Sequence, residues 1–115
     1  MMIFEYKQNF KNSLNHYFVE STPNNLAVLF LALVDYAGKS KKLPKISIPK
    51  MYELSYDLDN GDLKLAYMEL KSFPSAKSVE NMILVILMLF KGFGLTYEEF
   101  RQKLEKTLTN RLDIV

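Results

Sequence analysis

The densest group of possible oxygen ligands in the chain is the turn at 57–62, which reads DLDNGD. A calcium-binding helix–loop–helix site uses a twelve-residue loop with glycine at position 6 and glutamate at position 12. Counted from Asp57, glycine falls at position 5 and Met68 at position 12, while Glu69 misses the last position by one residue. One residue rotates a helical side chain by about 100°. The turn therefore fits the end of one helix and the start of the next, and we expect no calcium site.

Acid–base chemistry would have to come from His16, the one histidine, or from the adjacent carboxylates Glu98 and Glu99. An imidazole base needs an orienting partner, and a protein-bound metal needs several ligands. The polar residues near His16 offer one hydrogen bond and little else, and Glu98 and Glu99 are typical charges for the first turn of a helix. We therefore expect no catalytic residue, no metal and no cofactor, and a protein that is not an enzyme.

Positive charge is concentrated in one segment, whose lysines could contact phosphate: Lys39, Lys41, Lys42, Lys45 and Lys50. The segment has no arginine, and no exposed aromatic ladder for stacking on bases is evident in the chain. A solvated loop is therefore the favoured interpretation over a phosphate-contacting site.

Tyr52 and Tyr56 follow this segment and lie four residues apart, off the stripe formed by Leu54 and Leu58. Paired exposed tyrosines are typical anchors for protein contacts. They fit equally well beneath the basic loop, and the two interpretations stay open. These two tyrosines and the five lysines form the expected partner-binding set.

Two segments, 26–34 and 82–90, are apolar on every side at helical pitch. A helix of that kind must be enclosed by other helices, by a second subunit or by lipid. Both runs are far shorter than the roughly 20 residues that a bilayer needs, which indicates buried core helices. Since few helices remain to cover two fully apolar ones, a homodimer is a further expectation.

The pattern predicts an all-α bundle, a single domain over residues 1–115, built from six helices in three successive hairpins. The expected helices cover 4–19, 23–37, 49–58, 62–72, 76–91 and a last segment from 97. Thr22 and Pro23 fit a helix start, and Gly38 fits a helix end. Thr96 and Glu99 form a capping box, with a buried stripe expected at Phe100, Leu104 and Leu108.

Composition excludes several classes of function. With 115 residues and no cysteine, the chain has no disulfide, thiolate zinc site or cysteine nucleophile. Its net charge of +2 comes from interspersed charges and does not by itself predict nucleic-acid binding. Glu5 and Lys7 interrupt the region where a secretion signal would be apolar, so we expect a cytoplasmic protein that is not bound to a membrane.

The stretch 52–74 resembles one helical hairpin of the tetratricopeptide type, and the matching residues are Tyr56, Gly61, Asp62, Ala66, Tyr67 and Pro74. A fainter echo about 34 residues later places Gly94 and Phe100 near the equivalent positions, close to the period of that family. This resemblance would imply a peptide-binding surface and no chemistry.

The stretch 78–111 is similar to the end of the all-α nucleoside triphosphate pyrophosphohydrolases of the MazG type. The matching residues are Glu80, Asn81, the run LTYEE at 95–99, Lys106, Asn110 and Arg111. Those enzymes hold magnesium with acidic residues from two helices. The corresponding positions here are Ser78, Asn81, Ala32, Leu33 and Asp35. Because magnesium demands oxygen ligands, the resemblance implies a relative without the chemistry.

We therefore expect a small non-enzymatic protein-interaction module, such as an adaptor, inhibitor, immunity factor or assembly chaperone. The first alternative is a nucleic-acid-associated accessory factor that binds phosphate through the basic loop. The second is a catalytically degenerate relative of the pyrophosphohydrolases.

Overall fold

The computed structural model describes residues 2–40, 63–73 and 75–113, and it confirms the all-α class. The described residues form five helices: α1 Ile3–Val19, α2 Pro23–Ser40, α4 Leu63–Ser72, α5 Ala76–Gly92 and α6 Tyr97–Asp113. The helix expected at 49–58, and with it the hairpin to the next helix, lies outside the described residues.

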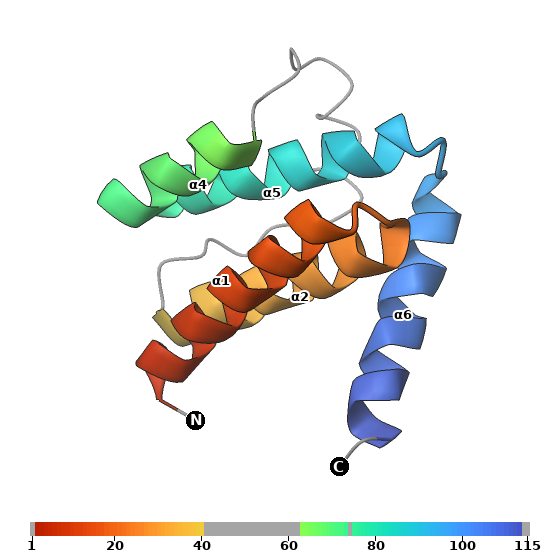
Figure 1. The fold of residues 1–115 in the computed structure, drawn as a ribbon, viewed down its shortest axis with the longest axis horizontal. Helices are drawn as coiled ribbons and strands as arrows, with labels where there is room; N and C mark the ends of the chain where they lie inside the picture. The colour runs from red at the N-terminus through yellow and green to blue at the C-terminus, as the bar shows by residue number, and fades with distance from the viewer. Residues whose placement is uncertain (1, 41–62, 74, 114–115) are drawn as a thin grey trace.

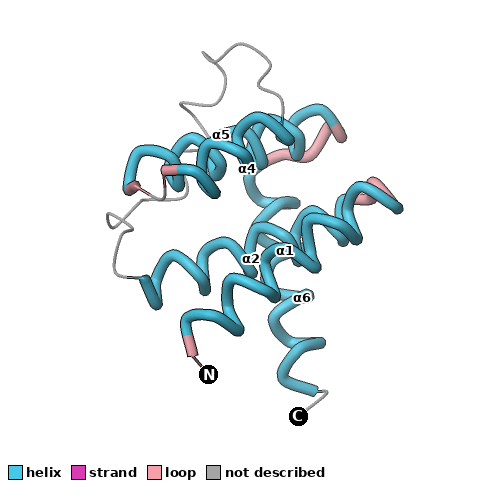
Figure 2. The backbone as a smooth tube through the Cα atoms, turned by 60° about the vertical axis from the view of Figure 1, so that its left-hand side comes forward, coloured by secondary structure: helices cyan, strands magenta, loops and turns pink. Residues whose placement is uncertain are grey.

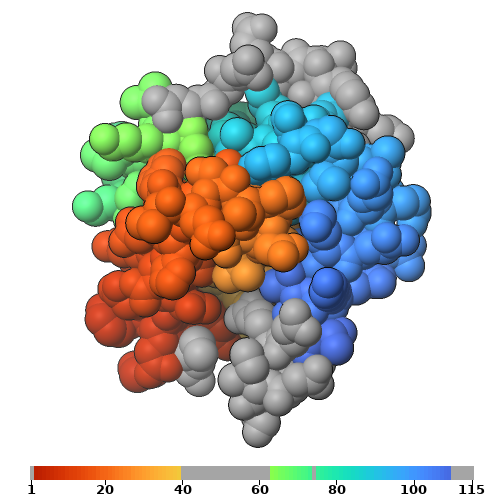
Figure 3. Space-filling model, turned by 45° about the vertical axis from the view of Figure 1, so that its right-hand side comes forward, coloured from red at the N-terminus to blue at the C-terminus, as the bar shows by residue number. Residues whose placement is uncertain are grey.

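The two apolar segments lie in α2 and α5, one in each of the two helix pairs that Figure 1 shows one above the other. Six consecutive residues of α5, 82–87, are buried, as expected for a helix enclosed by other helices. Helix α2 contacts α1, α5 and α6, and α5 also contacts α4. In the space-filling view, little of the middle of α2 is visible between α1 and α6 (Figure 3).

The helices pair as α1 with α2 and α4 with α5, and both pairs lie side by side in two views (Figures 1 and 2). The expected third hairpin is wrong, because α6 leaves α5 at 109° and packs against α2 instead. The turn between them explains the angle. Gly94 has a φ of +77°, the Gly94 N–H donates to the Lys91 carbonyl at 2.8 Å, and the Leu95 N–H donates to the Phe90 carbonyl at 3.3 Å. This is a Schellman arrangement, which ends a helix and redirects the chain.

Helix starts were predicted well. The Asn25 N–H donates to Thr22 Oγ1 at 3.1 Å, which confirms the cap of α2. The Thr96 capping box is also confirmed, because the Glu99 N–H donates to Thr96 Oγ1 at 3.2 Å and the Thr96 N–H donates to Glu99 Oε1 at 3.3 Å. A second box, Ser75 with Ser78, starts α5 and was missed, since serine replaces the usual glutamate or glutamine.

Two predicted boundaries are corrected. Helix α2 continues through Gly38 to Ser40, because Gly38 lacks the positive φ that would end a helix there. The stripe on α6 is buried at Phe100, half-buried at Leu104 and exposed at Leu108, since α6 extends away from the other helices (Figure 1). No single helix in the described segments is long and apolar enough to cross a bilayer, although the bent pair α5 and α6 passes on combined length and composition.

Candidate functional site

Of the seven residues expected to bind a partner, Lys39 is described. It lies in the last turn of α2 rather than in a loop, and its Nζ lies 5.7 Å from the centre of the Tyr6 ring, a cation–π contact. The other six lie outside the described residues: Lys41, Lys42, Lys45, Lys50, Tyr52 and Tyr56. The acidic turn at 57–62 lies outside them as well.

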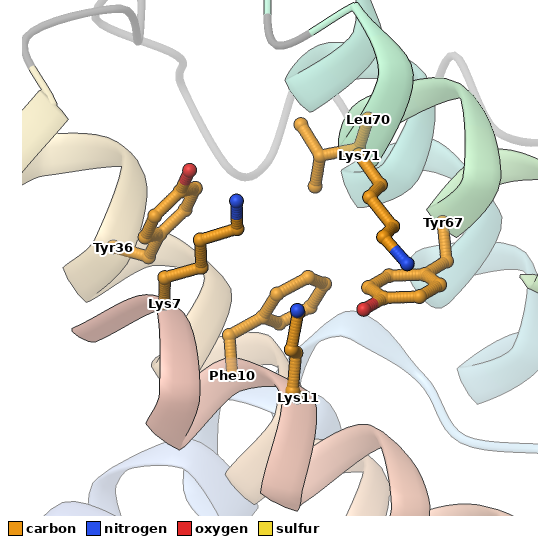
Figure 4. Close-up of a pocket in the computed structure, with 7 residues that line it drawn as sticks. All are labelled: Lys7, Phe10, Lys11, Tyr36, Tyr67, Leu70 and Lys71. Atoms are coloured by element: carbon orange, nitrogen blue, oxygen red, sulfur yellow. The ribbon is translucent and has the colours of Figure 1, made fainter. Parts of the chain in front are cut away.

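A small pocket opens where α1, α2 and α4 meet (Figure 4). We call it the lysine–tyrosine pocket. Its described lining comprises three lysines, two tyrosines and two apolar residues: Lys7, Lys11, Lys71, Tyr36, Tyr67, Phe10 and Leu70. The enclosed space is about 10 Å³, enough for one water-sized group, so most of a ligand would lie at the mouth.

Aromatic side chains form the floor and walls of the lysine–tyrosine pocket. Phe10 is buried, and its ring stacks near that of Tyr36, with centroids 6.2 Å apart and planes 15° apart. The Tyr67 ring lies 5.7 Å from Phe10 at 54°. One ring comes from each of the three helices, so the apolar packing that joins the helices also shapes the pocket.

The lysines come from the edges of two helices. Lys7 and Lys11 lie one turn apart on α1, on the solvent side of the stripe that buries Phe10, and Lys71 lies on α4. Figure 4 shows Lys7 and Lys11 on the α1 side of the pocket and Lys71 on its α4 side. Among the described residues, none of them forms an ion pair with a carboxylate. Three cations that lack an ion-pair partner among these residues repel one another, which favours binding of a negative group.

The tyrosine hydroxyls add neutral hydrogen-bond donors. In Figure 4 the Tyr67 hydroxyl points toward the end of Lys11, and the Lys71 chain descends toward the Tyr67 ring. Burial raises the pKa of Tyr67 above its ordinary value of 10.0. The phenol therefore keeps its proton at neutral pH and remains able to donate.

Exposed apolar side chains lie on both helices that carry the lysines. On α1, Phe4 is three residues before Lys7 and is 72% exposed. On α4, Met68 is three residues before Lys71 and is also exposed. Residues three apart are neighbours on a helix surface, so apolar groups border the charged pocket on two sides. We call this face of α1 and α4, including the pocket, the α1–α4 face.

The lone histidine lies elsewhere, in an open groove at the junction of α1 and α2. The described lining of that groove is Asn15, His16, Val19, Glu20 and Asn25. Asn25 Nδ2 donates to the Glu20 carbonyl at 2.8 Å, which ties the junction together. Within the described segments, no three residues among His, Cys, Asp and Glu are placed to hold a metal ion.

Three of the five positions suggested by the pyrophosphohydrolase resemblance have structural roles. Ala32 and Leu33 are buried in the core. The Ser78 hydroxyl is also buried, and its one proton is shared between the Phe73 and Ser75 carbonyls, whose oxygens lie 2.7 and 2.8 Å away. These three side chains therefore offer a divalent cation no free oxygen ligand.

Comparison of the chain with protein families, characterised proteins and solved structures gives no match. The α1–α4 face is thus the main guide to function. Sequence reasoning missed its lysines and tyrosines, although the pair Lys7 and Lys11 beside Phe10 was a visible signal. Lys71 is 60 residues away in the chain and joins them through tertiary packing alone.

Proposed function

We propose that this chain is a non-enzymatic cytoplasmic protein-interaction module that binds a partner protein through the α1–α4 face. The single observation that carries the proposal is the lysine–tyrosine pocket, bordered by exposed apolar side chains on two helices.

The two parts of the face contribute differently to binding. Apolar side chains such as Phe4 and Met68 lose contact with water when a partner covers them, which supplies most of the affinity in protein interfaces. The lysines attract an acidic partner and select against a basic one, because charge complementarity governs specificity and association rate. A face with both parts suits a partner that presents a negative group beside apolar side chains.

The alternative role, binding nucleic acid through phosphate, draws support from the same three lysines and from Lys39 on α2. Nucleic-acid backbones present phosphates at regular intervals, and binding them takes a stripe of cations along the contact. Three described lysines of the α1–α4 face, Lys7, Lys11 and Lys71, instead line one small pocket. We therefore rank this role second.

Site-specific photocrosslinking in the source cells tests the proposal. A photoreactive amino acid replaces Met68 on the α1–α4 face or, as the control, Leu108 on α6. The two side chains are matched, with exposed fractions of 48% and 49%. We expect a discrete adduct of one partner protein at position 68 and none at position 108. Diffuse labelling of equal strength at both positions would contradict the proposal, and an adduct with a second copy of the chain would indicate a homodimer.

A further inference from the structure

We infer that the lysine–tyrosine pocket binds a phosphate monoester carried by the partner protein, such as a phosphorylated side chain. This inference rests on the proposed function and names the chemical group that the partner presents to the pocket.

The donor set favours phosphate over carboxylate. A phosphate monoester carries close to two negative charges and three strong acceptor oxygens at neutral pH. Three lysines and two tyrosines line the pocket, and they come from α1, α2 and α4. A carboxylate carries one charge and two acceptor oxygens, so it would satisfy fewer of these donors than a phosphate does. Lysine binds phosphate as a point charge, without requiring the planar geometry of an arginine fork.

The shape of the pocket agrees with a terminal group rather than a whole small molecule. Its floor is the buried Phe10, and the enclosed space is about the size of one water. A phosphate would therefore lie across the mouth, among the lysine ammonium groups and the two hydroxyls. The chain that carries it would extend over Phe4 and Met68, where apolar neighbours of the phosphorylated residue find contacts.

The described surface also argues against an extended nucleic acid. Glu69 lies two residues before Lys71 on α4 and is exposed, and Glu5 lies two residues before Lys7 on α1 and is exposed. Residues two apart do not face each other on a helix, so these carboxylates lie outside the group of cations. They would repel the further phosphates of an extended backbone, whereas one isolated phosphate can be centred on the pocket.

A nuclear magnetic resonance titration tests the pocket directly. The probes are inorganic phosphate, phenyl phosphate, acetate and an oligonucleotide without terminal phosphates, each added at constant pH and ionic strength. We expect phosphate and phenyl phosphate to shift the backbone amides around Phe10, Tyr36 and Tyr67 to saturation. Acetate should bind about tenfold more weakly, because its single charge and two oxygens satisfy fewer donors.

Charge-neutralising variants supply the controls. The double variant Lys11→Gln/Lys71→Gln should weaken phosphate binding roughly tenfold, since it removes two of the three charged donors. It should stay folded, because the substitution also removes like-charge repulsion. Lys106→Gln on α6 changes one charge at an exposed site outside the pocket and should leave phosphate binding within about twofold.

Several results would overturn the inference. These are shifts that never saturate, acetate binding as tight as phosphate, or a loss with Lys106→Gln equal to that with the double variant. If the oligonucleotide shifts the same backbone amides and binds more tightly than phenyl phosphate, the pocket would be assigned to nucleic acid instead.

Phosphatase treatment separates this inference from the proposed function. Crosslinking at position 68 is repeated in an extract treated with a phosphatase, and we expect the adduct to disappear. An adduct that survives the treatment would overturn the phosphate inference and leave the interaction module in place. The absence of any adduct from the untreated extract would instead contradict the proposed function.

Discussion

Phe100 anchors α6 to the rest of the fold, and replacing it with leucine tests that packing. The Phe100 side chain is fully buried. Its ring meets Phe90 edge-to-face with centroids 4.4 Å apart and Phe30 edge-to-face at 5.4 Å. The three rings come from α6, α5 and α2, so this cluster joins three helices.

The expected loss follows from those two contacts. Each edge-to-face pair is worth about 0.5–1.5 kcal/mol beyond the area that it buries. A leucine in the same place keeps most of the apolar volume, and such swaps usually cost below about 1.5 kcal/mol. We therefore expect Phe100→Leu to lower the free energy of unfolding by about 2–3 kcal/mol. For a chain of this size, that loss lowers Tm by roughly 8–15 °C.

Urea denaturation followed by circular dichroism measures the loss, and Phe18→Leu is the matched control. Phe18 undergoes the same chemical change on the exposed side of α1 and should change stability by no more than about 0.5 kcal/mol. The double-mutant cycle with Phe30→Leu isolates one contact and should give a coupling of about 0.5–1.5 kcal/mol. Equal losses from Phe100→Leu and Phe18→Leu, or a coupling near zero, would refute the packing of α6 on α2.

Three further predictions concern the helix ends and the pocket. Gly94→Ala should lower the free energy of unfolding by about 1–2 kcal/mol, because its φ of +77° is unfavourable for alanine. No atom lies within 4 Å of the added Cβ, so the new methyl group gains no contact that would offset this loss. Gly92→Ala, at the last residue of α5 and with equally open space around an added Cβ, should stabilise the fold by about 0.5–1 kcal/mol. Chemical denaturation of both variants measures the two changes, and a change of the opposite sign in either would contradict the prediction. Ser78→Ala should cost about 1–2 kcal/mol, since the lost hydroxyl is buried and bonded to backbone, whereas exposed Ser72→Ala should be near neutral in the same assay. Tyr67 should ionise above pH 10, because burial raises its pKa. Above pH 10 the unfolded chain releases this proton first, so the free energy of unfolding falls there. In an ultraviolet titration, Tyr67→Phe should show less late-ionising tyrosine than the unaltered chain, and an equal amount in both would contradict this.

The helices were predictable from the sequence because they depend on interactions between residues close together in the chain. The apolar runs in α2 and α5 could be stable only as enclosed helices, and Thr22 and Thr96 marked helix starts through hydrogen bonds that span three residues. The direction of α6 was not predictable in the same way. A short connection suggested an antiparallel neighbour, whereas the positive φ of Gly94 and the attraction of Phe100 to Phe30 turn the helix toward α2.

The lysine–tyrosine pocket shows why functional sites are harder to predict than helices. Lys7 and Lys11 are ordinary solvated charges on an amphipathic helix when seen in sequence. They become a site only because packing of the Phe10 and Tyr67 rings brings Lys71 to the same point. The expected partner-binding set, in contrast, followed local charge density and shares no residue with the described pocket lining.

The most direct test of the α1–α4 face as a binding surface is to identify the partner by crosslinking and then to measure its affinity for surface variants of the chain. Phe4→Ser/Met68→Ser removes two exposed apolar side chains from the face. Val19→Ser/Leu108→Ser removes two exposed apolar side chains that lie elsewhere. The account predicts that the first pair lowers partner affinity by about tenfold or more, as loss of central interface contacts does, and that the second pair changes it by less than about twofold. Equal affinities for the two pairs would contradict it.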